Sequence, residues 1–454
     1  MSDLFEPLYS AAEMKAAEAR YPGFPATAPE LMERAGVAVA REAMRTFPQA
    51  RRFAVVCGGG SNGGDGRIAA RILREAGRDA VETDEPEGFD VVVDALFGTG
   101  FRGEPRPEAA ALIARINAAG APVVAVDVPS GVDASTGEVA VCAVDATLTV
   151  TFHGLKVGTV VAPGRFHAGR VVVADIGLDH TSTAARRATA AILDLVPRRG
   201  ARDSKVTAGR VLAVGGSRGM SGAVCLAAEA AFRADAGYVT VAVPHEVLPV
   251  VESRLLEPVK VGFAPDDAVG TILLAAERAD AVALGPGLGR ESHVASLVRE
   301  LLERLDLPVV VDADALFGFE PVQRAPATVL TPHTGELARL LGESSAWVDE
   351  HRLEAARRCA DRYGACVLLK GADTIVLGPG GEPVVVDAGP PSLATAGSGD
   401  VLTGVIAAFL AKGLDAETAA AAGAFAHGRA AALVPQQAGL IASDVVAALP
   451  RALS

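Results

Sequence analysis

The chain has 454 residues, half of them hydrophobic and 4% aromatic, with a formal net charge of −13. This length exceeds what one hydrophobic core usually supports, so we expect two domains. The acidic balance argues against nucleic acid or an anionic membrane as a partner. It does not exclude a small anionic ligand, because a loop can bind phosphate through backbone N–H groups.

The cysteines and the first residues bear on the compartment. The five cysteines are an odd number, and no two have the Cys-x-x-Cys spacing, so neither a zinc site nor a disulfide framework is indicated. The stretch MSDLFEPLYS lacks the basic and apolar regions of a signal peptide, and no run approaches the roughly 20 apolar residues of a membrane span. We therefore expect a reducing, cytoplasmic setting.

Short β-branched runs alternate with alanine-rich segments from one end of the chain to the other. This alternation is typical of α/β architecture with mostly parallel sheets. The predicted strands are residues 53–56, 90–94, 123–127, 211–214, 238–243, 281–284, 309–312, 328–330 and 366–369. The predicted helices between them include residues 66–76 and 109–119, and residues 375–386 are predicted to form a hairpin that turns at Pro-Gly-Gly.

One stretch interrupts the alternation. DLVPRRGARDSKVTAGR, at residues 194–210, is basic and polar, and a new apolar strand starts directly after it. We therefore expect a domain boundary near residue 200, with a first domain at 1–199 and a second at 200–454, each of ordinary domain size.

The glycine-rich stretch CGGGSNGGDG, at residues 57–66, follows the first predicted strand and contains a G-x-G-x-x-G match. A dehydrogenase would use such a loop to bind a dinucleotide, and two acidic residues lie about 20 residues further on, where a ribose-binding acid would sit. However, Asp65 lies within the loop, and Asp94 and Asp127 end later strands that point to the same crevice. These carboxylates suit a bound cation or acid–base chemistry better than a bare pyrophosphate. The alternative is that Asp94 and Asp127 only cap helices.

Three polar residues near these strand ends offer oxygen ligands. They are Asn62, Asp94 and Ser130. A set of this kind suits a hard cation such as a monovalent alkali ion.

Four stretches of the first half carry a resemblance to a known family. They are LMERAG (31–36), SNGGDG (61–66), VDALFGTGFRGEP (93–105) and VDVPSGVDASTGEV (126–139). Together they resemble the N-terminal epimerase domain of the bifunctional NAD(P)H-hydrate repair enzymes, over most of residues 1–195. The family usually has two asparagines before Gly-Gly-Asp, whereas this chain has Ser61 in the first place. The resemblance implies a Rossmann-like, doubly wound sheet.

The same resemblance implies roles for individual residues. Asp127 would be the general acid/base near C6 of the hydrated nicotinamide ring and would contact the substrate. Asn62, Asp94 and Ser130 would hold K+. Lys156 lies where the family also has a lysine, and a surface lysine is the alternative. The residues implied to cradle the hydrated dinucleotide are Ser61, Asn62, Gly63, Gly64, Asp65, Gly98, Thr99, Gly100, Phe101, Arg102, Gly103 and Glu104.

In the second half, the most informative stretch is TAGSGDVLTG at residues 395–404. Gly397, Ser398 and Gly399 precede an apolar helical run, so their N–H groups would form an anion hole at a helix N-terminus. Asp400, at the start of that helix, could take the proton from a hydroxyl that attacks a phosphate. A helix cap without chemistry is the alternative.

Further motifs occupy the same predicted edge of the second sheet. They are VGGSRGMSGA (214–223), GPGLG (285–289), VDADAL (311–316), TPHTGE (331–336) and LLKGADT (368–374). Within this set we favour contact with substrate for His333 over a solvated loop histidine. In this order the motifs resemble the ribokinase-like superfamily and, more narrowly, the ADP/ATP-dependent NAD(P)H-hydrate dehydratase domain, from about Lys205 to the C-terminus.

This second resemblance implies a ribokinase-like α/β domain in which Asp400 is the catalytic base. Mg2+ would offset the charge of the nucleotide phosphates, with Glu336 as a candidate near it. ADP is the expected nucleotide, because fused enzymes of this family generally use it. The residues implied to bind the nucleotide are Lys370, Gly371, Ala372, Asp373, Thr374, Gly397, Ser398 and Gly399. Those implied to bind the hydrated substrate are Ala223, Gly287, His333 and Asp400.

The two halves together predict a bifunctional isomerase and lyase. It would interconvert the R and S forms of the hydrated dinucleotides NADHX and NADPHX and dehydrate the S form with ADP. One alternative is a vitamin-precursor kinase fused to a non-catalytic nucleotide-binding domain. The other is an inactive first domain that serves as a binding module. The family resemblance also implies a homo-oligomer.

Overall fold

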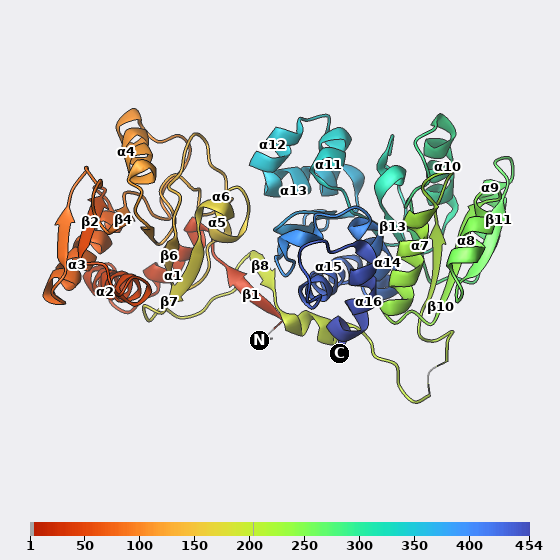
Figure 1. The fold of residues 1–454 in the computed structure, drawn as a ribbon, viewed down its shortest axis with the longest axis horizontal. Helices are drawn as coiled ribbons and strands as arrows, with labels where there is room; N and C mark the ends of the chain where they lie inside the picture. The colour runs from red at the N-terminus through yellow and green to blue at the C-terminus, as the bar shows by residue number, and fades with distance from the viewer. Residues whose placement is uncertain (1–3, 203) are drawn as a thin grey trace. The chain divides into compact units, whose positions relative to one another are not determined.

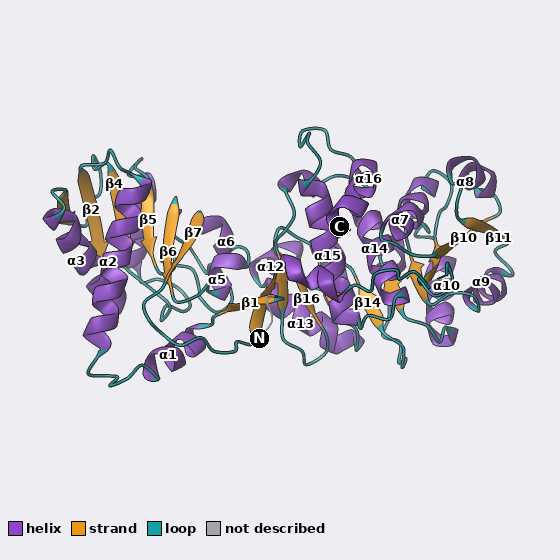
Figure 2. Cartoon of the chain, turned by 90° about the horizontal axis from the view of Figure 1, so that it is seen from below, coloured by secondary structure: helices purple, strands orange, loops and turns teal. Residues whose placement is uncertain are grey.

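The computed structural model describes residues 4–202 and 204–454. The chain forms two compact units, which are described separately. The smaller unit comprises Pro7–Arg186 with Asp349–His351, and the larger comprises the chain up to Glu6, Arg187–Val348 and Arg352–Ser454 (Figure 1). Helices and strands alternate in both units, so the predicted α/β class is confirmed (Figure 2). Within the described residues, no helix is long and apolar enough to cross a membrane.

The smaller unit contains a parallel sheet of six strands, in the order β3-β2-β4-β5-β6-β7. Successive residues of β2 face opposite sides: Phe53 and Val55 join one buried cluster, and Ala54 and Val56 join another. The strands are β2 (Arg52–Cys57), β3 (Asp79–Glu82), β4 (Val91–Ala95), β5 (Val123–Val126), β6 (Leu148–Phe152) and β7 (Arg170–Ala174). The helices are α1 (Ala11–Ala19), α2 (Ala28–Thr46), α3 (Ser61–Glu75), α4 (Pro107–Ala118), α5 (Val157–Val160) and α6 (Gly164–His167).

The larger unit is built on an eleven-stranded sheet, in the order β1-β8-β17-β16-β15-β14-β13-β12-β9-β10-β11. Strands β9 to β15 pair in parallel, and β15, β16 and β17 pair antiparallel, which confirms the predicted hairpin. The strands are β1 (Phe5–Leu8), β8 (Ala185–Ala188), β9 (Arg210–Val214), β10 (Tyr238–Pro244), β11 (Val259–Phe263), β12 (Ala281–Leu284), β13 (Val309–Val311), β14 (Thr328–Leu330), β15 (Cys366–Leu369), β16 (Thr374–Leu377) and β17 (Val384–Val386).

Helices of the larger unit connect these strands. They are α7 (Ser221–Arg233), α8 (Leu248–Arg254), α9 (Ala268–Ala276), α10 (Ser292–Arg304), α11 (Thr334–Leu341), α12 (Ser345–Glu350), α13 (Arg352–Tyr363), α14 (Ser398–Ala411), α15 (Ala416–Ala432) and α16 (Ala442–Leu453). Short 3-10 turns lie at Ala190–Leu195, Ala313–Leu316 and Pro391–Leu393.

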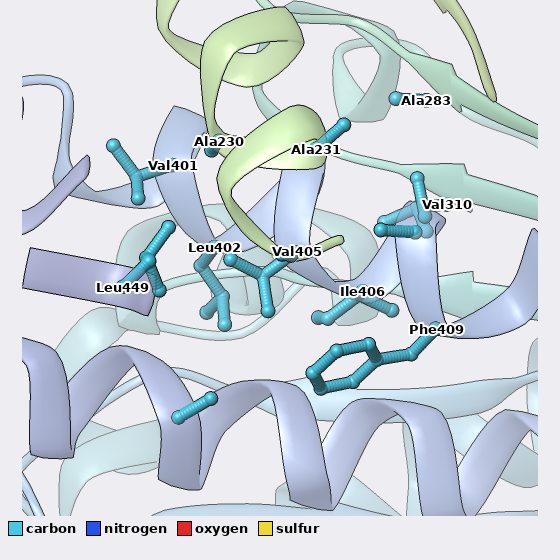
Figure 3. Packing of buried hydrophobic residues seen from close by; sticks show 14 of the residues in the cluster. Ala230, Ala231, Ala283, Val310, Val401, Leu402, Val405, Ile406, Phe409 and Leu449 are labelled. Atoms are coloured by element: carbon cyan, nitrogen blue, oxygen red, sulfur yellow. The ribbon is translucent and has the colours of Figure 1, made fainter. Parts of the chain in front are cut away.

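Helix α14 is buried on every side from Val401 to Leu410, as expected for a helix that is apolar all round. Its side chains pack among α7, α15, α16 and the sheet (Figure 3). Gly404 permits the close approach to α7, because a Cβ there would overlap the carbonyl oxygen of Ala227. The core therefore fixes the position of the α14 N-terminus.

The nine predicted strands are confirmed to within one residue at each end. Six strands were not predicted: β1, β3, β6, β7, β8 and β11. Four of these are the outermost strands of the two sheets, and β8 is next to the edge. These five strands are partly exposed and can carry charged residues, so their apolar signal is weak, whereas β6 is buried and two threonines interrupt its apolar run.

Candidate active sites

The glycine-rich stretch follows β2, where the strand order of the smaller sheet reverses. From β2 the chain passes to β3 on one side and then to β4 on the other, so the loops after β2 and β4 diverge. A crevice at this point is the usual ligand site of a doubly wound sheet. The helix after β2 begins at Ser61, five residues earlier than predicted from the sequence. Residues 61–65 are therefore its first turn rather than a loop.

Close packing explains this early start. Gly63 lies against Gly58, the residue after β2, because a Cβ at Gly63 would overlap the carbonyl oxygen of Gly58. Gly66 lies against the side chain of Ala95 on β4, and Gly36 of α2 lies against Ile68 of α3. Only glycine allows these approaches, so the helix N-terminus, with its free N–H groups, is held at the crevice.

A pair of alanine substitutions tests this packing. We expect Gly63→Ala to lower the free energy of unfolding by about 1–3 kcal/mol, because overpacking must push Gly58 or α3 away. Gly59→Ala, in the same loop, should have little effect, since a Cβ there meets nothing within 4 Å. Thermal or urea unfolding of the two variants measures the difference. Equal stabilities would contradict the proposed packing.

The three predicted oxygen ligands form one cluster. Asp94 is fully buried, and its two oxygens accept hydrogen bonds from the Ser130 hydroxyl (2.6 Å) and the Ser130 N–H (2.8 Å). The Asn62 amide donates a hydrogen bond to the carbonyl of Phe97 (2.8 Å). The backbone N–H of Phe97 in turn donates to Ser130 Oγ (2.9 Å). Burial raises the pKa of Asp94 to about 6, although the bonds from Ser130 act in the opposite direction. A nearby cation would compensate a buried carboxylate of this kind.

Asp127 directly follows β5 and has a left-handed backbone conformation, with φ at 67°. This conformation is uncommon for a residue other than glycine and often marks a functional position. Its Oδ1 lies 2.8 Å from Nζ of Lys156 and accepts a hydrogen bond from the Thr151 hydroxyl (3.0 Å). Lys156 is fully buried, which excludes the alternative of a surface lysine.

Two further carboxyl groups interact electrostatically with Asp127. Asp65, in the first turn of α3, is buried, and burial raises its pKa to about 8, with smaller contributions from the charges of Asp127 and Glu18. Glu18, on α1, also has a raised pKa, through burial first and the charge of Asp127 second. Asp65 is therefore mostly protonated at neutral pH. The sequence analysis had given no role to Glu18.

The second predicted part of the cradle, residues 98–104, is the loop that follows β4 and leads toward α4. Gly98 touches Asn62: a Cβ at Gly98 would lie 2.9 Å from Asn62 Oδ1. Phe101 stacks on Phe97 with ring centroids 4.8 Å apart. The rest of this loop is exposed or partly exposed, at Thr99, Gly100, Arg102, Gly103 and Glu104. The structure thus brings the two halves of the predicted cradle together.

In the larger unit, one lysine connects four of the predicted motifs. Lys370, after β15, lies 2.9 Å from Asp312 Oδ1 and 3.8 Å from Glu336 Oε2. Gly399, in the first turn of α14, is close enough that a Cβ there would lie 3.4 Å from Lys370 Nζ. Burial lowers the pKa of Lys370, but the charges of Asp312 and Glu336 outweigh it, so the pKa is raised. Lys370 therefore stays a cation at the N-terminus of α14.

Asp312 is fixed by this lysine and by a hydroxyl from α14. Thr403 Oγ1 donates to its Oδ2 (2.6 Å) across 91 positions of sequence. Burial alone would raise the pKa of Asp312. The charge of Lys370 and the hydrogen bonds have a larger, opposite effect, so the pKa of Asp312 is lowered. Sequence analysis placed this aspartate at the sheet edge without giving it a role, and it had no signal for Thr403.

Asp400 is partly buried in the first turn of α14. Burial raises its pKa to about 7; the charge of Asp312 adds to this effect, and Lys370 opposes it. A carboxyl with this pKa can accept a proton near neutrality. The N–H of Ser398 already donates to the carbonyl of Thr395 (3.3 Å), so the free N–H groups of this turn are those of Gly399 and Asp400.

The predicted substrate contacts fall into two groups. Gly287 touches Ala223, since a Cβ at Gly287 would lie 3.2 Å from the Ala223 side chain. Gly287 has a φ of 69°, which favours glycine. His333 is the N-cap of α11, and its Nδ1 accepts hydrogen bonds from the N–H groups of Gly335 and Glu336. The His333 side chain is 57% exposed, so the rest of the ring stays accessible.

The predicted nucleotide loop, residues 370–374, is fixed by a buried ion pair. Asp373 is buried and pairs with the equally buried Arg352, with 3.0 Å between Oδ2 and Nε. A Cβ at Gly371 would overlap Arg352 as well. The Asp373 side chain therefore supports the loop through this buried ion pair. Ala372 and Thr374 belong to the same loop, and the Thr374 hydroxyl donates to the carbonyl of Gly371 (3.1 Å).

Comparison with known proteins gives family matches over both units. Residues 211–451 match a family model described as NAD(P)H-hydrate dehydratase, and residues 28–83 and 78–158 match one described as YjeF-related protein N-terminus. The bifunctional NAD(P)H-hydrate repair enzyme Nnr of Moorella thermoacetica is 39% identical, over 93% of this chain and 92% of that protein. The enzyme of the same name from Escherichia coli is 36% identical, over 93% of this chain and 89% of that protein.

Solved structures are similar to the larger unit. The ADP/ATP-dependent NAD(P)H-hydrate dehydratase of Bacillus subtilis, co-crystallised with ATP and Mg2+, is 30% identical with a TM-score of 0.53. The match covers 57% of this chain and 94% of that one. A ribokinase-like superfamily protein from Enterococcus faecalis is 25% identical with a TM-score of 0.53, over 61% of this chain and 97% of that one.

Proposed function

The chain belongs to the family of bifunctional NAD(P)H-hydrate repair enzymes, and from this premise we propose that each unit carries one of the two reactions. The smaller unit interconverts the R and S forms of NADHX and NADPHX, and the larger dehydrates the S form. One observation carries this division: each unit places an aspartate among charged partners near the carboxyl ends of its strands, Asp127 in the smaller unit and Asp400 in the larger.

Epimerisation requires the hydroxyl at C6 of the hydrated ring to leave and return on the opposite face. As it leaves, the oxygen keeps the C–O electron pair and takes a proton, so water departs and the ring nitrogen forms an iminium with C6. Water then adds from the other face and gives up a proton. We assign this proton exchange to Asp127, whose negative charge also stabilises the iminium. Asp65, with a pKa of about 8, is a neighbouring carboxyl that holds a proton at neutral pH.

Dehydration follows the logic of phosphoryl transfer. Asp400 accepts the proton of the C6 hydroxyl as that oxygen attacks the terminal phosphate of ADP. The bond between the two phosphates breaks and AMP leaves, so a phosphate ester replaces a poor leaving group. Phosphate then leaves with the C–O electron pair, assisted by the ring nitrogen, and loss of a ring proton regenerates NADH or NADPH. We assign stabilisation of the phosphate charge to Lys370 and to the N–H groups of Gly399 and Asp400, which the closeness of Gly399 to Lys370 supports.

The residues present fit the two cations that the family implies. Asn62, Asp94 and Ser130 form an all-oxygen cluster that would hold K+, which supplies positive charge beside the dinucleotide. Buried Glu336 would contribute to holding Mg2+, which offsets the charge of the nucleotide phosphates. Nucleotide and Mg2+ use is supported by the Bacillus subtilis dehydratase, co-crystallised with ATP and Mg2+. ADP as the natural nucleotide is our proposal.

Three further assignments complete the proposal. The two activities map to residues 1–199 and 200–454, the chain assembles as a homo-oligomer, and it works in the cytoplasm. The alternative of a vitamin-precursor kinase is disfavoured, because the matched relatives over both halves are repair enzymes. The carboxylates around Asp127 also disfavour an inactive first unit.

The test follows the near-ultraviolet absorbance of reduced nicotinamide after the protein is mixed with Mg2+, ADP and an R/S mixture of NADHX. We expect complete recovery of NADH, faster than spontaneous epimerisation allows. Recovery that stops at the S fraction would remove the epimerase assignment. Absence of recovery with ADP and with ATP would overturn the dehydratase assignment, and recovery with ATP alone would overturn the choice of ADP.

A further inference from the structure

The hydrogen bonds of Asp127 fall on one of its two carboxylate oxygens. Oδ1 accepts from the Thr151 hydroxyl (3.0 Å) and the Phe152 N–H (3.4 Å) and lies 2.8 Å from Lys156 Nζ. Within the residues that the structure describes, no hydrogen bond reaches Oδ2. The side chain is 11% exposed, so its free oxygen is the one that a ligand can meet.

Thr151 is bonded to both members of the Asp127–Lys156 pair. Its hydroxyl accepts a hydrogen bond from Lys156 Nζ (2.8 Å) and donates its own proton to Asp127. The hydroxyl has only one proton to donate, so while Lys156 is charged its direction is fixed toward the carboxylate. Lys156 Nζ also donates to the carbonyl of Phe152 (2.7 Å), which fixes the ammonium group.

The backbone around Lys156 is fixed by hydrogen bonds to Tyr9, near the start of the smaller unit. The N–H of Tyr9 donates to the carbonyl of Leu155 (2.8 Å), and the N–H of Val157 donates to the carbonyl of Tyr9 (3.2 Å). The ring of Tyr9 fills the space where a side chain at Gly154 would lie. Lys156 therefore has little freedom to withdraw from Asp127.

We propose that Thr151 and Lys156 are positioning residues of the epimerase site: they occupy Oδ1 of Asp127 and leave Oδ2 as the oxygen that exchanges the proton of the C6 hydroxyl. The proposal rests on the epimerase function proposed above. Neither residue touches the substrate in this scheme. Their removal lets the carboxylate rotate, so it lowers kcat and leaves KM nearly unchanged.

The strand β6 provides a matched set of variants. Thr151→Val removes the hydroxyl and keeps the shape, whereas Thr151→Ser keeps the hydroxyl. Thr149→Val is the control, because Thr149 lies on the same strand, is equally buried, and donates its hydroxyl to the carbonyl of Ala168 (2.7 Å), away from Asp127. Lys156→Met removes the ammonium as a second, independent variant.

The assay measures conversion of R-NADHX by each full-length variant, with excess Asp127→Asn protein, Mg2+ and ADP to convert S-NADHX to NADH. We expect Thr151→Val to lower kcat for epimerisation about 10- to 100-fold, as for loss of a hydrogen bond to a charged group. Thr151→Ser and Thr149→Val should stay within about threefold of wild type. Lys156→Met should fall at least as far as Thr151→Val. Circular dichroism and thermal unfolding of each variant report whether the smaller unit, which carries the substitution, is folded.

Four results would overturn the proposal while leaving the epimerase function intact, and three of them concern kcat. They are wild-type kcat in Thr151→Val, equal losses in Thr151→Val and Thr149→Val, and a Thr151→Ser variant as slow as Thr151→Val. A rise in KM without a fall in kcat would show direct substrate contact and would also overturn it. If the wild-type protein itself does not convert R-NADHX, the epimerase function fails, which is a separate result.

Discussion

Replacing Asp400 with asparagine is expected to lower kcat for dehydration of S-NADHX by about 100- to 10,000-fold, the usual contribution of a general base. Asparagine keeps the shape of the side chain but cannot accept the proton of the attacking hydroxyl. The measurement is the initial rate of NADH formation from S-NADHX with Mg2+ and ADP. Epimerisation should be unaffected, because Asp127 and its partners belong to the other unit.

The pH profile gives the same prediction a second test. Burial raises the pKa of Asp400 to about 7, and only the ionised form can act as base. We therefore expect kcat/KM for dehydration to rise with pH up to about 7 and then to level off. In the Asp400→Asn variant, the remaining kcat/KM should not show this rise with pH. A profile that is unchanged in the variant would show that another group is titrating.

Stability distinguishes lost chemistry from lost folding. The pKa of Asp400 is higher in the folded chain than its ordinary value, so the folded state binds its proton more tightly. The resulting stabilisation is fully present below the ordinary value and is lost as the pH rises through about 7. Asparagine carries no charge, so Asp400→Asn should melt at the same or a higher temperature than wild type at pH ~8. A lower melting temperature would point to a structural role for Asp400 instead.

Replacing Asp127 with asparagine is expected to abolish conversion of R-NADHX, with a loss of about 100- to 10,000-fold. In an R/S mixture with Mg2+ and ADP, NADH formation should stop at the S fraction and then continue only at the spontaneous rate. Dehydration of pure S-NADHX should keep its wild-type rate. Loss of both activities in a folded protein would show that the two reactions are not divided between the units as proposed.

The parts of the fold that sequence analysis could predict are those with a strong local signal. Buried parallel strands such as β5 and β12 are continuous apolar runs, and the carboxyl ends of parallel strands meet at one edge. This explains why residues as far apart as Asp312 and Lys370 could be assigned to one site. The outer strands β3 and β11 have weak signals, because a partly exposed strand tolerates charge.

The partners that hold the reactive groups could not be predicted. Thr403 bonds Asp312 from 91 positions away, and Arg352 pairs with Asp373 from 21 positions away. No local pattern indicates such pairs, since each depends on how two elements pack. The start of α3 was misplaced for a similar reason. Glycines usually favour a loop, but here Gly63 and Gly66 form a helical turn because their missing side chains allow close contact with β2 and β4.

The strands β1 and β8 show what a chain cut at residue 200 would lose. At one end of the eleven-stranded sheet β8 lies beside β17 and β1 lies beside β8, and Arg187 of β8 forms ion pairs with Glu6 (3.0 Å) and Asp387 (2.9 Å). A fragment that begins at residue 200 lacks both strands and leaves the backbone of Val384–Val386 as a bare apolar edge. Such edges recruit strands from other molecules and aggregate. Strands β1 and β8 therefore protect the edge of a sheet whose other strands, β9 to β17, all follow them in the chain.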